Sequence, residues 1–231
     1  MILTTDDAAD RLATVHSAIA RAARSVGRDP AHIELVAISK TWAPDAIAPL
    51  IAAGHRSFGE NRVGEAQDKW PALRAEVLKS NVASARGIRL HLVGQLQSNK
   101  AADAVALFDV IHSVDRPSLI AALGQAMNAA GKHPDCYIQV NIGGEVQKGG
   151  CAIADLPDML AAARAAGVPV IGLMCVPPAD TEAAPFFALL AELARRHGLS
   201  QLSMGMSADY ESAAMLGATV IRVGSALFGN R

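Results

Sequence analysis

The feature of this sequence that most limits its fold is a repeated alternation of short apolar runs and longer helical stretches. Eight runs of β-type composition occur, and each is followed by an Ala-, Leu- and Glu-rich stretch or by the carboxyl terminus. The runs occupy residues 33–39, 55–58, 88–94, 108–114, 135–141, 168–174, 199–205 and 218–224, and helical spacing recurs at 61–79, 116–130, 153–166, 182–197 and 207–216. Parallel strands need crossover connections, so this repetition predicts a parallel sheet.

The number of units favours a closed barrel. Eight strand–helix units in 231 residues fit a (β/α)8 TIM barrel, whose usual size is about 250 residues. The rival fold is an open doubly wound sheet, but ISKTWAP after the first run is no GxGxxG fingerprint. We therefore expect one α/β barrel domain over 1–231. An extra N-terminal helix is expected over 6–26, with Thr5 as its cap.

Composition excludes several classes of function. The chain carries 21 Lys and Arg against 22 Asp and Glu, and aromatic residues make up 4%. A nucleic-acid surface needs clustered basic residues or exposed rings, so we expect no nucleic-acid partner. No apolar stretch reaches the roughly 18 residues of a spanning helix, and the acidic N-terminus does not resemble a signal peptide. We expect no membrane association.

The cysteines and histidines do not suggest a metal centre. Cys136, Cys151 and Cys175 lie far apart and form no CxxC motif, which argues against disulfides and a zinc site. We infer a reducing, cytoplasmic environment and no bound metal. His91 and His112 fall within predicted strands, where we interpret them as hydrogen-bonded core groups rather than ligands.

Lys40 is the first candidate for chemistry, because active sites of such barrels lie at the carboxyl ends of the strands. It follows the apolar run in IELVAISKTW (33–42). One interpretation is an ordinary surface lysine. The other is a partly desolvated amine, which loses its proton more easily and can form a Schiff base with an aldehyde.

An aldehyde cofactor with a phosphate group would need an anion site, which barrels build after strands 7 and 8. Ser207 follows the seventh run and is a predicted N-cap of the helix at 207–216. Gly224 and Ser225 follow the eighth run and offer backbone N–H and hydroxyl groups. Each fragment alone also fits an ordinary turn, but both occur where a phosphate site is expected.

Arg222 lies inside the apolar run TVIRVG, where a charge is costly unless it is paired. It could reach solvent or bind a carboxylate. Alternatively, its guanidinium could donate to the ring nitrogen of pyridoxal phosphate (PLP), which would leave that nitrogen unprotonated.

Six motifs together resemble a known family. LVAISKTW, FGENRVGEAQDKW, HLVGQLQSNK, VNIGGEVQKGG, GLMCVPP and LSMGMSADYESAAMLGATVIRVGSALFGNR resemble, in order, the pyridoxal phosphate homeostasis protein family. The resemblance runs from about residue 30 to the last residue. It implies a barrel similar to the N-terminal domain of alanine racemase, without that enzyme's second domain.

The resemblance also implies a set of cofactor-binding residues. PLP would be held as a Schiff base on Lys40, with its phosphate at Ser207, Gly224 and Ser225. Arg222 would bind the ring nitrogen. Asn61 would lie near the ring and its hydroxyl, or would cap the helix at 62–79, and the two roles are compatible. Lys148 matches a second family lysine that could receive cofactor, or it is a solvated loop lysine.

Three functions remain compatible with these residues. We favour a non-catalytic PLP carrier that takes part in vitamin B6 homeostasis, acts as a monomer and supplies PLP-dependent apo-enzymes. The alternative is an amino-acid racemase, which would need a second base, and neither Tyr137 nor Tyr210 is an evident one. A Schiff-base aldolase acting on a sugar phosphate would use the same lysine, but it gives no reason for Arg222.

Overall fold

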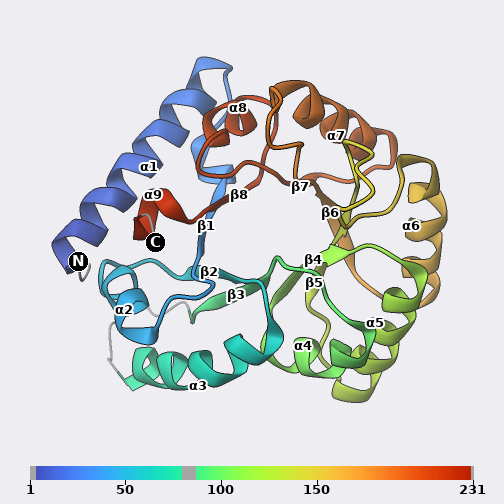
Figure 1. The fold of residues 1–231 in the computed structure, drawn as a ribbon, viewed down its shortest axis with the longest axis horizontal. Coiled ribbons are helices and arrows are strands. Elements are labelled where there is room, and N and C mark those ends of the chain that lie inside the picture. The colour runs from blue at the N-terminus through green and yellow to red at the C-terminus, as the bar shows by residue number, and fades with distance from the viewer. Residues whose placement is uncertain (1–3, 80–86, 230–231) are drawn as a thin grey trace.

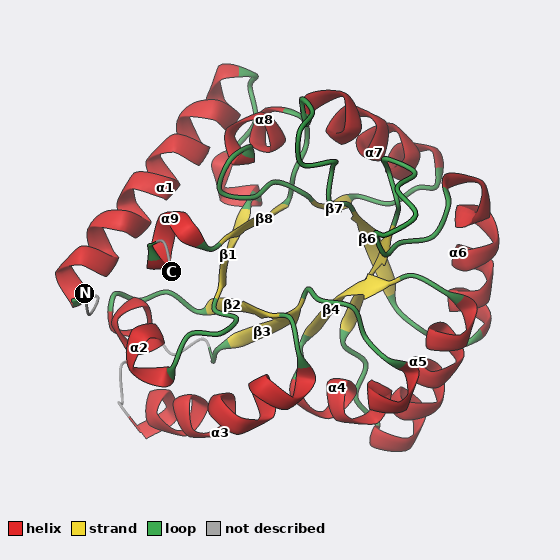
Figure 2. Cartoon of the chain, viewed as in Figure 1, coloured by secondary structure: helices red, strands yellow, loops and turns green. Residues whose placement is uncertain are grey.

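A closed barrel of eight parallel strands forms the centre of the protein (Figure 2). The structure is a computed structural model that describes residues 4–79 and 87–229 of the chain. Each strand pairs in parallel with the next along the chain, and β1 pairs with β8 to close the ring. The strands are β1 Glu34–Ile38, β2 Ser57–Glu60, β3 Arg89–Leu92, β4 Val110–Val114, β5 Asp135–Gln139, β6 Val170–Met174, β7 Gln201–Ser203 and β8 Val220–Val223. The predicted (β/α)8 barrel is therefore confirmed.

The helices surround the ring of strands (Figure 1). They are α1 Thr5–Ser25, α2 Pro44–Ala52, α3 Val63–Lys79, α4 Ala101–Leu107, α5 Pro117–Ala130, α6 Leu156–Ala165, α7 Ala184–Arg196, α8 Tyr210–Met215 and α9 Ser225–Phe228, with single 3-10 turns at Pro30–His32, Ser98–Lys100 and Ile153–Asp155. Within the described residues, no helix combines the length and the apolar character required to cross a bilayer.

The extra N-terminal helix α1 is present, but its predicted cap is wrong. Thr4, not Thr5, is the N-cap, because its hydroxyl accepts the backbone N–H of Asp7. The Asp7 carboxylate in turn accepts the backbone N–H of Thr4, which completes a capping box. Leu12, Val15 and Ile19 form the buried face of the helix, as their spacing predicts.

Two predicted segments differ from the structure in position. The second strand lies at 57–60 rather than 55–58, because Gly59 and Glu60 pair with β3 although neither residue type favours strands. Most of the loop predicted at 79–87 lies outside the described residues. The other seven predicted runs each contain their strand.

The inside of the barrel combines an apolar cluster with polar side chains. Val36, Val110, Tyr137, Met174 and Val220 form the apolar cluster. Because side chains alternate along a strand, residues two positions from these also face inward, which places His112 after Val110 and Arg222 after Val220. TIM-barrel interiors are mostly filled by branched apolar side chains. Buried polar groups here therefore need a separate explanation.

Candidate functional site at the carboxyl end of the barrel

A cavity of about 450 Å³ opens where β1, β7 and β8 end. Its volume lies within the range of about 300–1,000 Å³ that is common for small-molecule sites. The lining residues are Ile38, Lys40, Trp42, Met206, Ser207, Ala208, Arg222, Gly224, Ser225 and Gly229. The structure thus brings together five of the six predicted site residues, all except Asn61. We call this space the mouth cavity.

Asn61 lines a separate cavity of about 410 Å³ with Gln95 and Lys100, beyond the ends of β2 and β3. The helix α3 begins at Val63, so it starts one residue later than the predicted 62–79. The backbone of Asn61 is packed tightly against Gly94: a Cβ on that glycine would lie 2.2 Å from the Asn61 carbonyl oxygen. Only glycine fits there, and this close contact sets the position of Asn61.

Lys40 lies in a turn two residues beyond β1 and is half-buried. The next residue, Thr41, has φ 65°, and it is the one non-glycine residue with positive φ in the part of the chain that the structure describes. Such backbone costs a β-branched residue on the order of 1–3 kcal/mol and is common at functional sites. The Thr41 N–H donates to the Glu65 carboxylate, which holds the turn in this conformation.

The buried Lys69 side chain holds the turn that contains Lys40. Lys69 Nζ donates to the carbonyl oxygens of Ser39 and Trp42, at 2.9 Å and 3.2 Å, and to Glu65 Oε1 at 2.9 Å. It also forms an ion pair of 2.9 Å with Glu60, and the two side chains are 6% and 0% exposed. Since the bonds to Ser39 and Trp42 enclose Lys40 in the sequence, Lys69 restricts where the Lys40 backbone can lie.

The Glu60 carboxylate completes this network. It accepts the Ser39 hydroxyl at 2.7 Å and the Trp70 indole N–H at 3.0 Å. Burial raises the pKa of Glu60, while the hydrogen bonds from Ser39, Lys69 and Trp70 oppose the rise. Sequence reasoning missed this network. Its only local signal was the i,i+4 spacing of Glu65 and Lys69 in FGENRVGEAQDKW.

The predicted phosphate site has a different local structure from the one expected. The helix α8 begins at Tyr210, so the prediction that Ser207 is its N-cap is wrong. The reason is Asp209, whose carboxylate accepts the Met206 N–H at 2.6 Å and closes a turn before the helix. Ser207 instead accepts the Gly224 N–H at 3.3 Å, which joins the loops after β7 and β8.

The second half of this site is the start of α9 at Ser225, with Gly224 at the N-cap position. The Leu227 N–H already donates to the Gly224 carbonyl oxygen, so the first N–H groups of α9, at Ser225 and Ala226, are the ones without an intrahelical acceptor. Together with the hydroxyls of Ser207 and Ser225, they supply donors to one side of the mouth cavity. The arrangement fits a small anion such as a phosphate group.

Arg222 enters the mouth cavity from β8 and is 5% exposed. Its Nη1 donates to Ser203 Oγ at 2.5 Å and its Nη2 donates to the Cys175 carbonyl oxygen at 2.8 Å. Among the described residues, no carboxylate lies within ion-pair distance of it. Burial lowers the pKa of Arg222, yet a guanidinium remains charged in proteins. Neither ordinary interpretation, solvent exposure or a carboxylate partner, describes this arginine.

Three other candidates lie outside the mouth cavity. Lys148 Nζ donates to the Pro177 carbonyl oxygen at 2.9 Å and forms an ion pair with Glu145, so it is a bonded loop lysine. Tyr137 is buried inside the barrel and Tyr210 begins α8. The described residues contain no group of three His, Cys, Asp or Glu side chains that could hold a metal ion, and the three cysteines are free.

Comparison with known proteins identifies the family of the chain. The family model for the alanine racemase N-terminal domain matches residues 14–231. The pyridoxal phosphate homeostasis protein of Pseudomonas aeruginosa is 38% identical over 229 residues, covering 96% of this chain and 95% of that relative. The chain belongs to the pyridoxal phosphate homeostasis protein family. The Escherichia coli protein of the same name is 35% identical over 235 residues, covering 98% of this chain and 97% of its own.

A solved structure of this family contains the cofactor. PipY of Synechococcus elongatus, described with PLP bound, is 37% identical and superposes with a TM-score of 0.78. The match covers 96% of this chain and 100% of that one. The predicted family and the predicted likeness to the alanine racemase N-terminal domain are therefore both confirmed.

Proposed function

We propose that this protein binds PLP in the mouth cavity, holds it as a Schiff base on Lys40, and takes part in intracellular PLP homeostasis. The observation that carries the proposal is that an amine, a buried guanidinium and a Gly–Ser anion site line one cavity. The names of its relatives and the PLP-bound PipY structure support the choice of cofactor.

Each residue has a separate role in this proposal. The Lys40 nitrogen bonds to the aldehyde carbon of PLP, and the aldehyde oxygen leaves as water. Ser207 and Ser225 bind the phosphate through their hydroxyl groups, and Gly224 lets the backbone approach it closely. Asn61, which lines a separate cavity, remains the proposed partner of the ring hydroxyl. Arg222 donates to the ring nitrogen and keeps it unprotonated, which makes the ring a weaker electron sink than an aspartate partner would.

A carrier role fits the mouth cavity better than racemisation. A racemase needs a base on each face of the bound amino acid. Lys40 could serve on one face, but neither tyrosine of the chain lines the cavity. We therefore propose that the chain stores PLP and supplies apo-enzymes, as one barrel domain that acts as a monomer in the cytoplasm. Light scattering of the purified protein would test the monomer.

The decisive experiment is trapping of the Schiff base. Apo-protein mixed with PLP should develop a visible absorption band that borohydride bleaches, and peptide mass mapping should find the pyridoxyl group on Lys40. Lys40→Ala should trap no cofactor, whereas the control Lys148→Ala should trap as much as the parent. Equal trapping in Lys40→Ala, or a pyridoxyl group at another residue, would refute the assignment.

A second experiment separates carrier from enzyme. The loaded protein is incubated with each amino acid in turn, and chiral chromatography follows the enantiomers. A carrier should leave them unchanged and should activate a PLP-dependent apo-enzyme when the two are mixed. Rapid racemisation of any amino acid would favour the alternative function.

A further inference from the structure

A line of polar side chains crosses the inside of the barrel from one end to the other. Arg222 Nη1 lies 2.5 Å from Ser203 Oγ, and Ser203 Oγ lies 2.8 Å from His112 Nδ1. His112 Nε2 lies 2.9 Å from His91 Nδ1, and His91 Nε2 lies 3.4 Å from Glu34 Oε1. Five strands contribute one residue each: β8, β7, β4, β3 and β1. We call these five residues the barrel chain.

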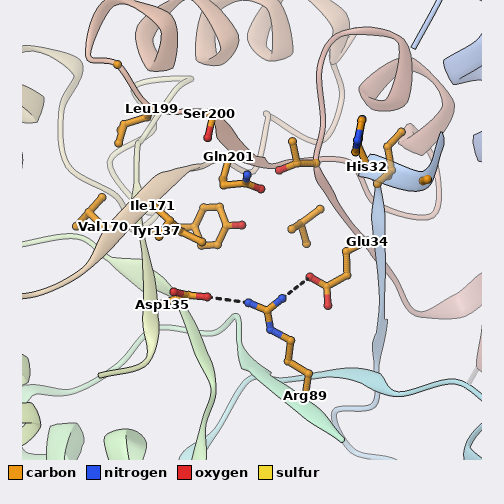
Figure 3. A pocket seen from close by; sticks show the side chains of 15 residues that line it. His32, Glu34, Arg89, Asp135, Tyr137, Val170, Ile171, Leu199, Ser200 and Gln201 are labelled. Atoms are coloured by element: carbon orange, nitrogen blue, oxygen red, sulfur yellow. Dashed lines mark hydrogen bonds and ion pairs between the residues drawn. The ribbon is translucent and has the colours of Figure 1, made fainter. Parts of the chain in front are cut away.

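The barrel chain ends in a second cavity at the amino ends of the strands, shown in Figure 3. This amino-end cavity has a volume of about 610 Å³. Arg89 lies between two carboxylates there, with Nη1 3.2 Å from Glu34 Oε2 and Nη2 2.8 Å from Asp135 Oδ2. The other Glu34 oxygen accepts the Ser57 hydroxyl at 2.6 Å and faces His91.

The two charged ends determine the direction of every hydrogen bond between them. A guanidinium only donates, so Ser203 Oγ accepts from Arg222 and its own proton remains to be donated to His112 Nδ1. A neutral imidazole has one donor and one acceptor nitrogen. His112 therefore carries its proton on Nε2 and donates to His91 Nδ1. His91 then also carries its proton on Nε2, which lies 3.4 Å from Glu34 Oε1. This buried nitrogen has no hydrogen-bond partner among the described residues, so its contact with the Glu34 carboxylate is an electrostatic one between the N–H and the negative charge.

The opposite direction is unfavourable at both ends. It would put a lone pair of a neutral His91 against the Glu34 carboxylate, or it would require a protonated His91. It would also make Ser203 Oγ accept from both Arg222 and His112. The Ser203 hydroxyl proton would then have no acceptor within the barrel chain. An unpaired buried donor costs about 1–3 kcal/mol.

Packing holds the central histidine in the orientation that the barrel chain needs. The His112 ring stacks on Tyr137, with ring centroids 4.6 Å apart and an interplanar angle of 13°. His91, His112 and Ser203 are fully buried. Burial, together with the nearby positive charges, holds the pKa of His112 well below its usual value, so the ring is neutral.

We propose that Ser203, His112 and His91 form a one-way donor chain through which Glu34, at the amino end, helps to orient the Arg222 guanidinium at the mouth. We therefore treat Ser203, His112 and His91 as positioning residues for the ring nitrogen of PLP. Their role toward PLP rests on the proposed function, whereas the direction of the hydrogen bonds does not. Consecutive hydrogen bonds polarise one another. Because the Ser203 hydroxyl donates its proton to His112, its oxygen becomes a stronger acceptor for Arg222.

The first test uses apo-protein and does not depend on the cofactor. ¹⁵N NMR of histidine-labelled protein at neutral pH should show both His91 and His112 as neutral rings protonated at Nε2. Glu34→Gln should shift both sets of ring nitrogen resonances. The matched control Asp135→Asn, which removes the other carboxylate on Arg89, should leave them in place. A proton on Nδ1 of either ring, or an equal response to both variants, would overturn the proposal.

The second test asks whether the barrel chain reaches the cofactor. Ser203→Ala removes one of the two acceptors of Arg222. It should weaken PLP binding about tenfold, the size of one hydrogen bond to a charged group, and shift the absorption maximum. The control is Ser113→Ala, because the buried Ser113 Oγ has no hydrogen-bond partner in the described structure. Identical affinity and spectrum in the two variants would refute the positioning role. Absence of a Lys40 Schiff base in the parent would instead refute the proposed function, and the NMR result would still decide the barrel chain.

Discussion

Each end of the barrel has a cavity and an arginine, but the two arginines differ in burial and in their partners. At the amino end, Arg89 is paired with two carboxylates and is 41% exposed. At the carboxyl end, Arg222 is almost fully buried, and in the described residues it has a hydroxyl and a carbonyl as partners. The charge at the amino end is already balanced within the protein, whereas the charge at the mouth is available to a ligand.

This difference shows that cavity size alone does not identify the functional site. The amino-end cavity is the larger, at about 610 Å³ against about 450 Å³. A buried cation without a carboxylate is costly to the folded protein, so its retention is better explained by a ligand that compensates it. A pyridine nitrogen and a phosphate are both suitable for the mouth cavity.

The largest expected effect is on stability, and it compares a buried ion pair at the carboxyl end with partly exposed ion pairs at the amino end. Lys69→Met should destabilise the apo-protein by about 3–5 kcal/mol, because it leaves Glu60 buried without its cation. Arg89→Met at the amino end should cost only about 0–1 kcal/mol, since its pairs are partly exposed. Urea unfolding at neutral pH measures both. Equal losses would contradict the distinction between a buried and an exposed network.

The second prediction concerns acid. Burial raises the pKa of Glu34, but the interactions of its carboxylate with the His91 N–H, the Ser57 hydroxyl and the positively charged Arg89 outweigh it and lower the pKa from 4.5 to about 2. Since the folded pKa is lower than the unfolded one, the stabilisation is present above about pH 4.5. It is lost as the pH falls towards about 2, and it amounts to at most about 3 kcal/mol.

Glu34→Gln should therefore flatten the fall in the free energy of unfolding between pH 4.5 and pH 2. Glu60 at the carboxyl end should act in the opposite sense. Burial raises its pKa, so its contribution is present at low pH and is lost as the pH rises through the folded pKa. Urea titrations of the parent and of Glu34→Gln across this range would check the sign. A parallel pair of curves would contradict it.

The sequence predicted the fold because the fold depends on local patterns. Eight apolar runs with helical stretches between them predicted the barrel, and the order of strand ends identified Lys40, Ser207 and Arg222 as neighbours. Errors arose where a single side chain changed a local boundary. Asp209 closes a turn that delays α8, and Thr4 rather than Thr5 has an aspartate at the right spacing.

The contacts that support the site could not be predicted, because they join residues far apart in the sequence. His112 bonds to Ser203, which lies 91 positions away, and Lys69 bonds to Ser39, which lies 30 positions away. The sequence supported the interpretation of His91 and His112 as hydrogen-bonded core groups, and this is confirmed. It contained no signal that their partners were each other or that the line ended at Arg222.

The third prediction compares the two arginines as ligands of the cofactor. Arg222→Ala should weaken PLP binding about 10- to 100-fold and shift the Schiff-base spectrum, because a hydrogen bond to a charged group contributes about 1.5–3 kcal/mol. Arg89→Ala, at the amino end of the barrel and outside the mouth cavity, should change the affinity for PLP by no more than about threefold. Titrating apo-protein with PLP and following absorbance measures both. An unchanged spectrum in Arg222→Ala would remove this arginine from the site.

The smallest expected effect is at the strained turn beside Lys40. Thr41→Gly relieves a left-handed conformation that costs an ordinary residue about 1–2 kcal/mol. The glycine also increases the entropy of the unfolded chain, by about 0.4–1 kcal/mol. The free energy of unfolding should therefore change by no more than about 1 kcal/mol.

Thr41→Ala is the matched control, because it keeps a Cβ and with it most of the strain. If the strained turn positions the amine, Thr41→Gly should form the borohydride-reducible product more slowly than Thr41→Ala. Equal rates would mean that the Lys69 network alone positions Lys40.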